Sequence, residues 1–147
     1  MLDKIEDPHN LGAIIRSAES FGFDGVIIPE RRSAKVSPTV YKTSAGAINN
    51  IKIVMVKNLN RAMEELKDQG FWIYGLAGEA DSSIDQTDLK GKVALVVGNE
   101  GDGLSRMVRE HCDMLVKIPM QGLVNSLNAS VASAISMYEL VRQNGFN

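Results

Sequence analysis

Residues 116–140 read VKIPMQGLVNSLNASVASAISMYEL, and this stretch combines the features that decide the fold. It opens as a short apolar strand over residues 116–118, which Pro119 ends, and a flexible polar turn follows at Gly122. Apolar residues then recur at steps of three and four, which predicts one apolar helix face. The members of that face are Val124, Leu127, Val131, Ile135 and Tyr138.

Two kinds of polar or small residue accompany this face. Asn125, Ser126 and Asn128 stand at the helix entrance, where their side-chain oxygens can cap free N–H groups or hold a ligand. Short side chains farther along allow another backbone to approach closely: Ala129, Ala132, Ser133, Ala134 and Ser136. Taken alone, the stretch is better explained as an ordinary strand–turn–helix with a polar cap, so it must be weighed with other motifs.

Strand and helix patterns alternate along the rest of the chain. Strands are expected at residues 2–5, 25–28, 51–56, 71–76 and 93–97, and helices at residues 10–21, 38–44, 58–67 and 104–111. Residues 79–92 are polar and predict a surface loop or an irregular helical turn. The alternation predicts a mostly parallel sheet with helices on both faces. Ligands bind at the carboxyl ends of such strands, where Gly78, Gly98 and Pro119 stand here.

Composition narrows the class of protein. The 147 residues suit one domain, and 44% hydrophobic with 23% charged residues is ordinary for a globular protein. A net charge of −2 gives no chain-wide electrostatic footprint for nucleic acid, so any RNA site must be local. The single Cys112 excludes an internal disulfide. With no apolar run that spans a bilayer and no signal peptide pattern, we expect a cytoplasmic protein.

The first motif with chemical content is DPHNLGAIIR, residues 7–16. Asp7 and Pro8 form a turn signal, and Asn10 is expected to cap the following helix. Arg16 lies about one and a half turns into that helix. It is either a surface charge on the polar face or a guanidinium directed at an anion.

The second motif is VGNEGDGL, residues 97–104, where a buried strand enters a glycine-rich turn. Its glycines at 98, 101 and 103 give the spacing GxxGxG, which differs from the dinucleotide fingerprint GxGxxG. A nicotinamide cofactor is therefore not favoured. Glu100 is either a ligand or acid–base group, or the exposed apex of the turn.

Taken together and in order, DPHNLGAIIRSAESFG, ALVVGNEGDGL and VKIPMQGLVNSLNASVA resemble the three motifs of the SpoU family. This family comprises the RNA ribose 2′-O-methyltransferases of the SPOUT superfamily. The segments GEADSSIDQT and REHCDMLVKIPM are most similar to the branch that methylates a guanosine ribose in 23S rRNA. Ala129 stands where the family often carries valine. Longer members have an N-terminal RNA-recognition domain, and here we expect one methyltransferase domain over residues 1–147 without it.

The resemblance implies an α/β fold whose C-terminal segment forms a deep trefoil knot. It also implies a homodimer in which Arg16 of one subunit serves the pocket of the other. S-adenosylmethionine would be bound in the knot by Leu76, Ala77, Gly78, Val97, Gly98, Ile118, Pro119, Met120 and Leu127.

The implied reaction is attack of a ribose 2′-hydroxyl on the sulfonium methyl group. Arg16 is the principal catalytic candidate, either as general base or as the group that stabilises the developing alkoxide. Asn10, Glu100, Ser126 and Asn128 would shape the site around it. Arg31 and Arg32 either contact RNA phosphates or form a solvated basic loop, and no metal is expected.

Three alternative functions stay open from the sequence. The substrate could be a tRNA ribose in place of ribosomal RNA. The chain could be a non-catalytic RNA-binding or ribosome-assembly module on the same fold, although Arg16, Glu100, Ser126 and Asn128 are all present. A nucleotide-dependent oxidoreductase would require the glycine-rich turn to bind a nicotinamide cofactor.

Overall fold

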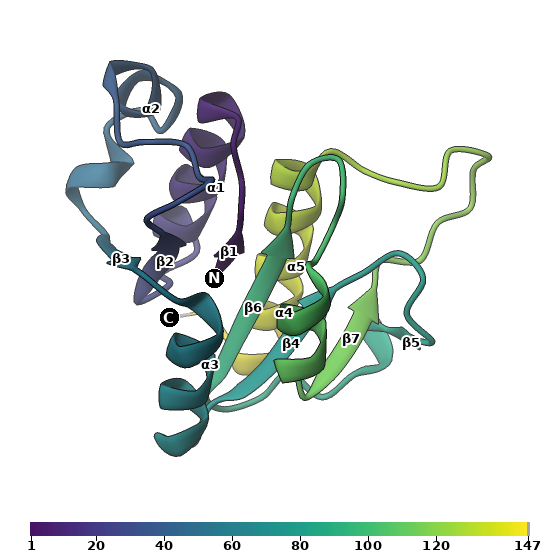
Figure 1. The fold of residues 1–147 in the computed structure, drawn as a ribbon. Coiled ribbons are helices and arrows are strands. Elements are labelled where there is room, and N and C mark those ends of the chain that lie inside the picture. Colours follow the sequence, from purple (N-terminus) through teal and green to yellow (C-terminus); the bar gives the residue numbers. More distant parts are fainter. Residues whose placement is uncertain (147) are drawn as a thin grey trace.

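The computed structural model describes residues 1–146 as alternating strands and helices (Figure 1). The elements in chain order are β1 (Leu2–Asp3), α1 (Pro8–Ser20), β2 (Gly25–Pro29), α2 (Pro38–Thr43), the 3-10 helix η1 (Ala47–Asn49), β3 (Lys52–Val56), α3 (Leu59–Asp68), β4 (Trp72–Leu76), β5 (Ser82–Ser83), the 3-10 helix η2 (Ile84–Gln86), β6 (Val93–Gly98), α4 (Arg106–His111), β7 (Met114–Lys117) and α5 (Ala129–Asn144).

The strands form a five-stranded sheet in the order β1-β6-β4-β7-β5 and a separate pair, β2-β3, beside β1. Every strand pair is parallel, which confirms the predicted α/β class. Gly75 pairs with Val96 of β6 on one side, and Leu76 pairs with Val116 of β7 on the other. The carboxyl ends of β6, β4 and β7 are therefore neighbours.

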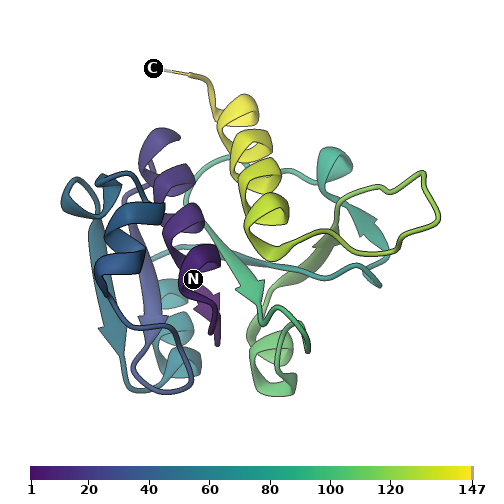
Figure 2. The ribbon, with the colours of Figure 1, turned by 90° about the horizontal axis from the view of Figure 1, so that it is seen from above.

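Helices cover both faces of the sheet, and alternate strand residues serve one face or the other (Figure 2). Tyr74, Leu95 and Val97 belong to the core shared with α1 and α5. Ile73 and Val96 belong to a second core, on the opposite face, with α3 and α4. Burial on both faces explains why VALVV lacks polar alternation.

Helix α1 begins earlier than predicted. Asp7 is its N-cap and accepts a hydrogen bond from the His9 backbone N–H at 2.8 Å, and Pro8 occupies the first helical turn. The assignment of Asn10 as the cap was wrong, because Asn10 lies within the helix and is buried. Its side chain is thereby free to make tertiary contacts.

Helix α5 differs from the prediction in its start and in its buried face. Residues 119–128 form an exposed loop that projects from the body, and the helix begins at Ala129 with Asn128 as N-cap (Figure 1). Val124 and Leu127 lie in that loop. Val131, Ile135 and Tyr138 are 46%, 41% and 49% exposed, so the predicted apolar face points away from the core of this chain.

The face of α5 that packs inward carries Ser133, Ser136, Met137 and Glu139. Two of these side chains are hydroxyls that bond within the helix: Ser133 Oγ donates to the Ala129 carbonyl at 2.7 Å, and Ser136 Oγ to the Ala132 carbonyl at 2.8 Å. Because both hydroxyls are satisfied locally, they can be buried without an unpaired polar group.

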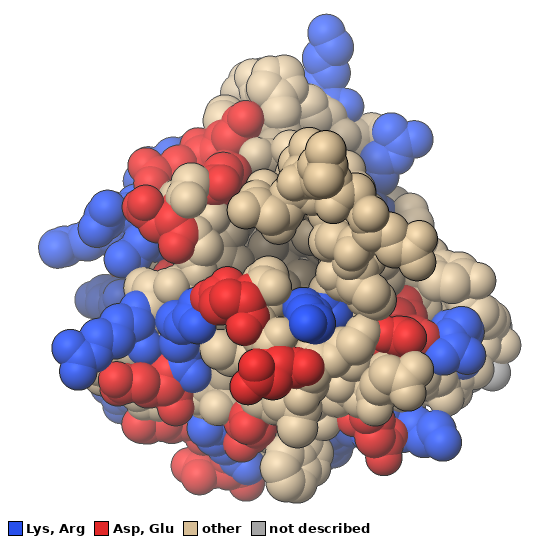
Figure 3. All heavy atoms as spheres, turned by 90° about the vertical axis from the view of Figure 1, so that its right-hand side faces the viewer, with Lys and Arg blue, Asp and Glu red and all other residues tan. Residues whose placement is uncertain are grey.

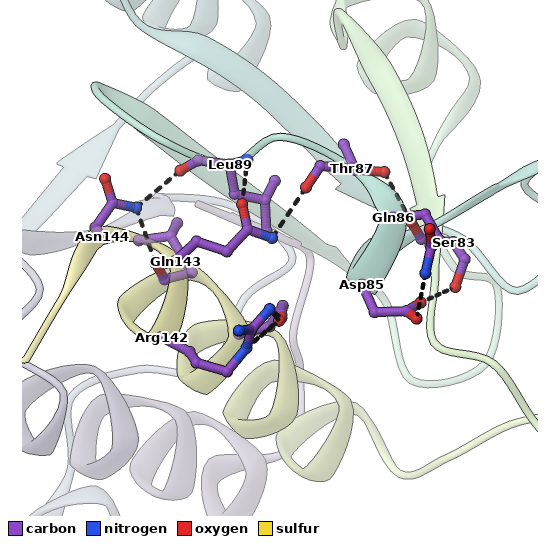
Figure 4. Close-up of polar contacts among 10 residues, drawn as sticks. Ser83, Asp85, Gln86, Thr87, Leu89, Arg142, Gln143 and Asn144 are labelled. Atoms are coloured by element: carbon purple, nitrogen blue, oxygen red, sulfur yellow. Dashed lines mark hydrogen bonds and ion pairs between the residues drawn. The ribbon is translucent and has the colours of Figure 1, made fainter.

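Residues 79–92 are more ordered than a surface loop. They contain β5 and η2, and Ala80, Ile84 and Leu89 are buried. Two side chains at the end of α5 bond to the backbone of this segment (Figure 4). Gln143 accepts from the Leu89 N–H at 2.8 Å and donates to the Thr87 carbonyl at 2.9 Å. Asn144 accepts from the Gly91 N–H at 3.0 Å and donates to the Leu89 carbonyl at 2.9 Å. We call these four bonds the amide clamp.

Candidate active site

A pocket of about 270 Å³ opens at the carboxyl ends of β4, β6 and β7. Its walls are the three segments that follow these strands, together with the start of α5. The lining residues are Leu76, Ala77, Gly78, Val97, Gly98, Asn99, Glu100, Gly101, Gly103, Val116, Lys117, Ile118, Met120, Asn125, Ser126, Leu127, Ala129 and Ala132. Figure 3 shows the face from which residues 119–128 project, with a hollow surrounded mainly by uncharged residues.

Most residues predicted to bind the cofactor lie on this pocket. Eight of the nine line it: Leu76, Ala77, Gly78, Val97, Gly98, Ile118, Met120 and Leu127. Pro119 is exposed and does not line the pocket. The topology therefore gathers three segments that are far apart in sequence, while the roles of these residues stay predictions.

Gly98 allows the turn after β6 to fold back tightly. Asn99 and Gly103 exchange two backbone hydrogen bonds of 2.9 Å, and Gly103 has a φ of +70°. A Cβ on Gly98 would lie 2.2 Å from the Gly103 carbonyl carbon and 2.3 Å from the Leu104 nitrogen. Only glycine fits this position without moving the backbone.

Asn99 is a pocket residue that the sequence reading missed. Its Oδ1 accepts from the N–H groups of Gly101 and Asp102 at 2.9 and 3.0 Å, while its Nδ2 donates to the Lys4 carbonyl at 2.7 Å. It thus shapes the turn and ties it to the end of β1. The available signal was an asparagine directly after a buried strand and before a glycine, a pattern typical of an Asx turn.

Glu100, Asn10 and Asn128 form a hydrogen-bonded chain across the three motifs. Asn10 Nδ2 donates to Glu100 Oε2 at 3.3 Å, and Asn128 Nδ2 donates to Asn10 Oδ1 at 3.2 Å. Asn128 Oδ1 accepts from the N–H groups of Ser130 and Val131 and so caps α5. Polar side chains from α1, the β6 turn and the N-cap of α5 are therefore joined at the pocket residue Glu100, although Asn10 and Asn128 do not themselves line the pocket.

The Glu100 carboxylate also accepts two backbone hydrogen bonds, from the Glu6 N–H at 3.2 Å and the Asp7 N–H at 2.8 Å. Burial alone would raise its pKa. Hydrogen bonds from its own backbone, from Asp7 and Glu6, and from Asn10 outweigh that effect and hold the pKa of Glu100 below its ordinary value. Glu100 is therefore an ionised anchor of the turn, with its lone pairs largely occupied.

Ser126 and Arg16 occupy different positions relative to the pocket. Ser126 lines it from the projecting loop. Arg16 is exposed on α1, does not line the pocket, and has no ion pair or side-chain hydrogen bond to residues 1–146. Within one subunit, the structure does not bring Arg16 together with the other candidate catalytic residues.

Arg31 and Arg32 are exposed in the loop after β2, and Arg32 has a φ of +55°. The loop is fixed to the end of β1, since the Ala34 N–H donates to the Ile5 carbonyl at 2.8 Å. Glu6 and Asp7, which follow directly, bind Glu100. The two arginines therefore lie on a loop anchored beside the Glu100 network.

Two other features are absent from residues 1–146. Residues 1–146 contain no cluster of three or more His, Cys, Asp or Glu side chains placed to hold a metal ion. None of the helices in this range combines the length and the apolar character needed to cross a membrane.

Comparison with known proteins identifies the family. The model of the SpoU rRNA Methylase family matches residues 1–138. The chain belongs to this family. It is 56% identical over 143 residues to the 23S rRNA (guanosine-2′-O-)-methyltransferase RlmB of Xanthomonas campestris pv. campestris, covering 97% of this chain and 57% of that protein. The chain thus spans a little over half the length of this curated relative.

Solved structures of the same family have the same fold. The SpoU methyltransferase AviRb from Streptomyces viridochromogenes, solved in complex with its cofactor AdoMet, superposes with a TM-score of 0.90 at 32% identity, over 97% of this chain and 58% of that one. The A. aeolicus TrmH/SpoU tRNA modifying enzyme superposes with a TM-score of 0.87 at 32% identity, over 97% and 72% of the two chains.

Proposed function

We propose that this chain is the catalytic domain of an S-adenosylmethionine-dependent RNA ribose 2′-O-methyltransferase, and that its target is a guanosine in 23S rRNA. The observation that carries the proposal is the pocket at the ends of β4, β6 and β7, whose lining residue Glu100 is hydrogen-bonded to Asn10, as Asn10 is to Asn128. The name of the 56%-identical relative supports the guanosine in 23S rRNA as the target. Such a substrate places the protein in the cytoplasm.

The pocket suits the proposed cofactor. Its walls are largely apolar, and the backbone segments that follow β4, β6 and β7 line it. The missing side chain of Gly98 makes room for a close approach of the turn. When bound, S-adenosylmethionine supplies an activated methyl group on a sulfonium. Leu76–Gly78, Val97–Gly98, Ile118, Met120 and Leu127 would hold it, while Pro119 would fix the path of the backbone between two pocket residues.

Arg16 is proposed to act on the attacking hydroxyl. A guanidinium remains protonated at neutral pH, so it serves best by binding the ribose oxygen or its adjacent phosphate and stabilising the developing alkoxide. A role for Arg16 as general base is the alternative. Glu100 is a poor candidate for that base because backbone N–H groups and Asn10 already occupy its carboxylate. Glu100, Asn10 and Asn128 are therefore proposed to position the pocket, and Ser126 to contact the ribose.

Arg16 reaches a pocket only if a second subunit supplies one, so the proposal includes a homodimer. Val131, Ile135 and Tyr138 form an exposed apolar stripe along α5, and α5 packs against α1, which carries Arg16. Burial of this stripe against a second copy would remove apolar surface from water. The same contact would bring Arg16 of one subunit toward the other subunit.

The trefoil knot is also proposed. β7 lies between β4 and β5 in the sheet, and α5, which follows β7, returns to the segment between β5 and β6 through the amide clamp. Ser133 and Ser136 are buried on the inward face of α5, where short side chains permit close packing. These features are those expected where one part of a chain passes through a loop made by another.

Arg31 and Arg32 are proposed to contact RNA phosphates. Their loop is fixed to Ile5, next to the residues that hold Glu100, and both arginines are exposed. Phosphate contacts of this kind would orient the RNA without reading its sequence. A tRNA ribose is the second candidate substrate, because a family member with the same fold is a tRNA modifying enzyme.

The experiment that tests this function has two steps. Calorimetric titration with S-adenosylhomocysteine should show saturable binding, with light scattering reporting a dimer. Transfer of a labelled methyl group should then be measured with 23S rRNA and with tRNA. Binding without transfer to either RNA would favour the non-catalytic module, and absence of binding by a folded dimer would refute the proposal.

A further inference from the structure

The positive charge of the chain is concentrated in one stretch, residues 31–63. This stretch has no aspartate or glutamate, although the net charge of the whole chain is −2. Its basic residues are all exposed, and they are Arg31, Arg32, Lys35, Lys42, Lys52, Lys57 and Arg61. A local excess of this kind is the electrostatic footprint of nucleic acid that the overall composition does not show.

The fold brings most of these residues to the end of the strands at which the pocket opens. β1 is parallel to β6, and the loop after β2 is fixed just past β1 by the bond from the Ala34 N–H to the Ile5 carbonyl. The ends of β2 and β3 are joined by a bond of 2.8 Å from the Glu30 N–H to the Val56 carbonyl. Lys52 pairs with Gly25 at the start of β2 and so lies at the opposite end. We use the name basic ledge for Arg31, Arg32, Lys35, Lys42 and Lys57.

Helix α2, which carries Lys42, is held close to the first sequence motif (Figure 1). A Cβ on Gly12 of α1 would lie 1.7 Å from Thr43 Oγ1, so the missing side chain of Gly12 lets α2 pack directly on α1. Arg16 follows Gly12 by one helical turn and lies on the same face of α1. The outer side of α2 exposes Lys42 and the ring of Tyr41, which is 46% exposed. The candidate catalytic arginine therefore lies on the side of α1 against which α2 packs.

The charges of the basic ledge are not neutralised by the part of the chain that the structure describes. Within residues 1–146, its five side chains make no ion pair and no hydrogen bond. Two neighbouring acids have other partners: Glu6 Oε1 accepts from Asn99 Nδ2 at 3.1 Å, and Asp7 Oδ1 accepts from the His9 N–H. Glu30, which precedes the loop, offsets one of the five charges. The ledge thus keeps a net positive charge for an anionic partner.

We propose that the basic ledge and α2 form the surface that holds the RNA substrate. The lysines and arginines bind phosphates of the nucleotides that flank the target, and the exposed ring of Tyr41 stacks on an unpaired base. Aromatic side chains beside basic groups are how proteins hold unpaired RNA. This inference rests on the proposed function and extends the RNA contact from Arg31 and Arg32 to α2. It places the bound strand beside Arg16.

Binding of 23S rRNA over a range of salt concentrations tests the role of the lysines. Lys42→Gln and Lys57→Gln should each reduce the slope of log affinity against log salt by about 1, because one phosphate contact is lost. Lys52→Gln is the matched control, since Lys52 lies on the same strand as the residue before Lys57 but at its other end, and its slope should equal that of the wild type. None of these residues lines the pocket, so affinity for S-adenosylhomocysteine should stay the same in all three variants.

Tyr41 has a different signature in the same experiment. Tyr41→Ala should weaken RNA binding about tenfold at every salt concentration and leave the slope unchanged, because stacking releases no counterions. Tyr41→Phe retains a ring and should bind like the wild type. Trp72→Ala removes an aromatic side chain that is 59% exposed at the start of β4, and it should also bind like the wild type.

Each outcome has a definite meaning. Equal slopes in Lys42→Gln, Lys57→Gln and Lys52→Gln would overturn the inference, and the ledge would then suit an acidic protein partner. Unchanged affinity in Tyr41→Ala would overturn the stacking contact. A wild-type chain that bound S-adenosylhomocysteine but not 23S rRNA would overturn the whole surface. A wild-type chain that bound RNA through these lysines, yet transferred no methyl group to it, would refute the proposed function and support the surface.

Discussion

Asn128 Nδ2 donates a hydrogen bond to Asn10 Oδ1 at 3.2 Å, across 118 residues of sequence. Through this bond the cap of α5 is connected to α1, and through Asn10 to Glu100 in the turn after β6. The three sequence motifs therefore meet in one polar chain beside the pocket. Asparagine side chains do not titrate, so the bond between Asn10 and Asn128 does not depend on pH.

Replacement of Arg16 should separate binding from methyl transfer. Arg16→Ala should reduce methyl transfer by about a hundredfold or more, because the group that stabilises the developing alkoxide is lost. Affinity for S-adenosylhomocysteine should stay the same, since Arg16 does not line the pocket of its own subunit. Transfer of a labelled methyl group and calorimetric titration report the two properties.

The matched control is Arg61→Ala, which removes an exposed arginine on α3 that is paired with Glu65. It should leave both transfer and binding unchanged. Full activity in Arg16→Ala would contradict the proposed mechanism.

Two glycines in the turn after β6 should respond differently to the same substitution. In Gly98→Ala the new Cβ would lie 2.2 Å from the Gly103 carbonyl carbon, so the turn must open and cofactor binding should be lost. In Gly101→Ala the nearest atom is Asn99 Oδ1 at 3.5 Å, an ordinary contact. Affinity for S-adenosylhomocysteine should therefore survive in Gly101→Ala. Equal affinities in the two variants would show that the tight turn is not required.

Short apolar runs with clear boundaries were predictable as strands. The strands expected at residues 25–28, 51–56, 71–76 and 93–97 agree with β2, β3, β4 and β6, because their apolar runs are bounded by glycine, proline or polar residues. The pocket was predictable for the same reason, since parallel strands bring the residues that follow them to one edge.

Helix α5 shows why the rest was not predictable. An apolar stripe in the sequence indicates that a helix face is buried. It does not show whether the same chain or a second chain buries it. Val131, Ile135 and Tyr138 therefore suggested a core face although they are exposed. Serine is a polar residue and does not by itself indicate a buried face. Ser133 and Ser136 are nevertheless buried, because their hydroxyls donate hydrogen bonds to carbonyls one turn earlier in the helix. Likewise, local sequence could not reveal that Asn10 bonds to Glu100 and Asn128.

Glu100 should make the stability of the chain depend on pH. Its pKa is below the ordinary value in the folded state, so its carboxylate stabilises the fold above the ordinary glutamate range and loses that contribution as pH falls through the folded pKa. Glu100→Gln should unfold more easily at pH 7, by about 1 kcal/mol because water competes at this exposed position.

Urea unfolding of the two proteins from pH 7 to pH 3 measures this difference. The free energies of unfolding should differ at neutral pH and converge in acid. A difference that stayed constant to pH 3 would mean that the effect of Glu100→Gln does not arise from the charge.

The apolar stripe on α5 should control assembly. Ile135→Glu places a charge in the centre of the stripe, so a dimer that buries this surface should dissociate into monomers in light scattering. Methyl transfer should fall as well, because Arg16 would lose its partner pocket. Val54→Glu is the control, since Val54 is similarly exposed, at 45%, on β3. A dimeric Ile135→Glu protein would exclude this stripe as the interface.

The amide clamp should determine how firmly the end of α5 is held. Gln143→Ala removes the acceptor of the Leu89 N–H and the donor to the Thr87 carbonyl, and Leu89 is fully buried. An unpaired N–H there should cost about 1–3 kcal/mol of unfolding free energy. Gln86→Ala, which loses only an exposed bond to Asp85, should change stability by less than about 0.5 kcal/mol.

Hydrogen exchange at Leu89 gives a local measure, and protection of that amide should fall in Gln143→Ala and not in Gln86→Ala. Unchanged protection of Leu89 in Gln143→Ala would contradict this prediction. The end of α5 would then be held against residues 79–92 by its buried contacts and not by the amide clamp.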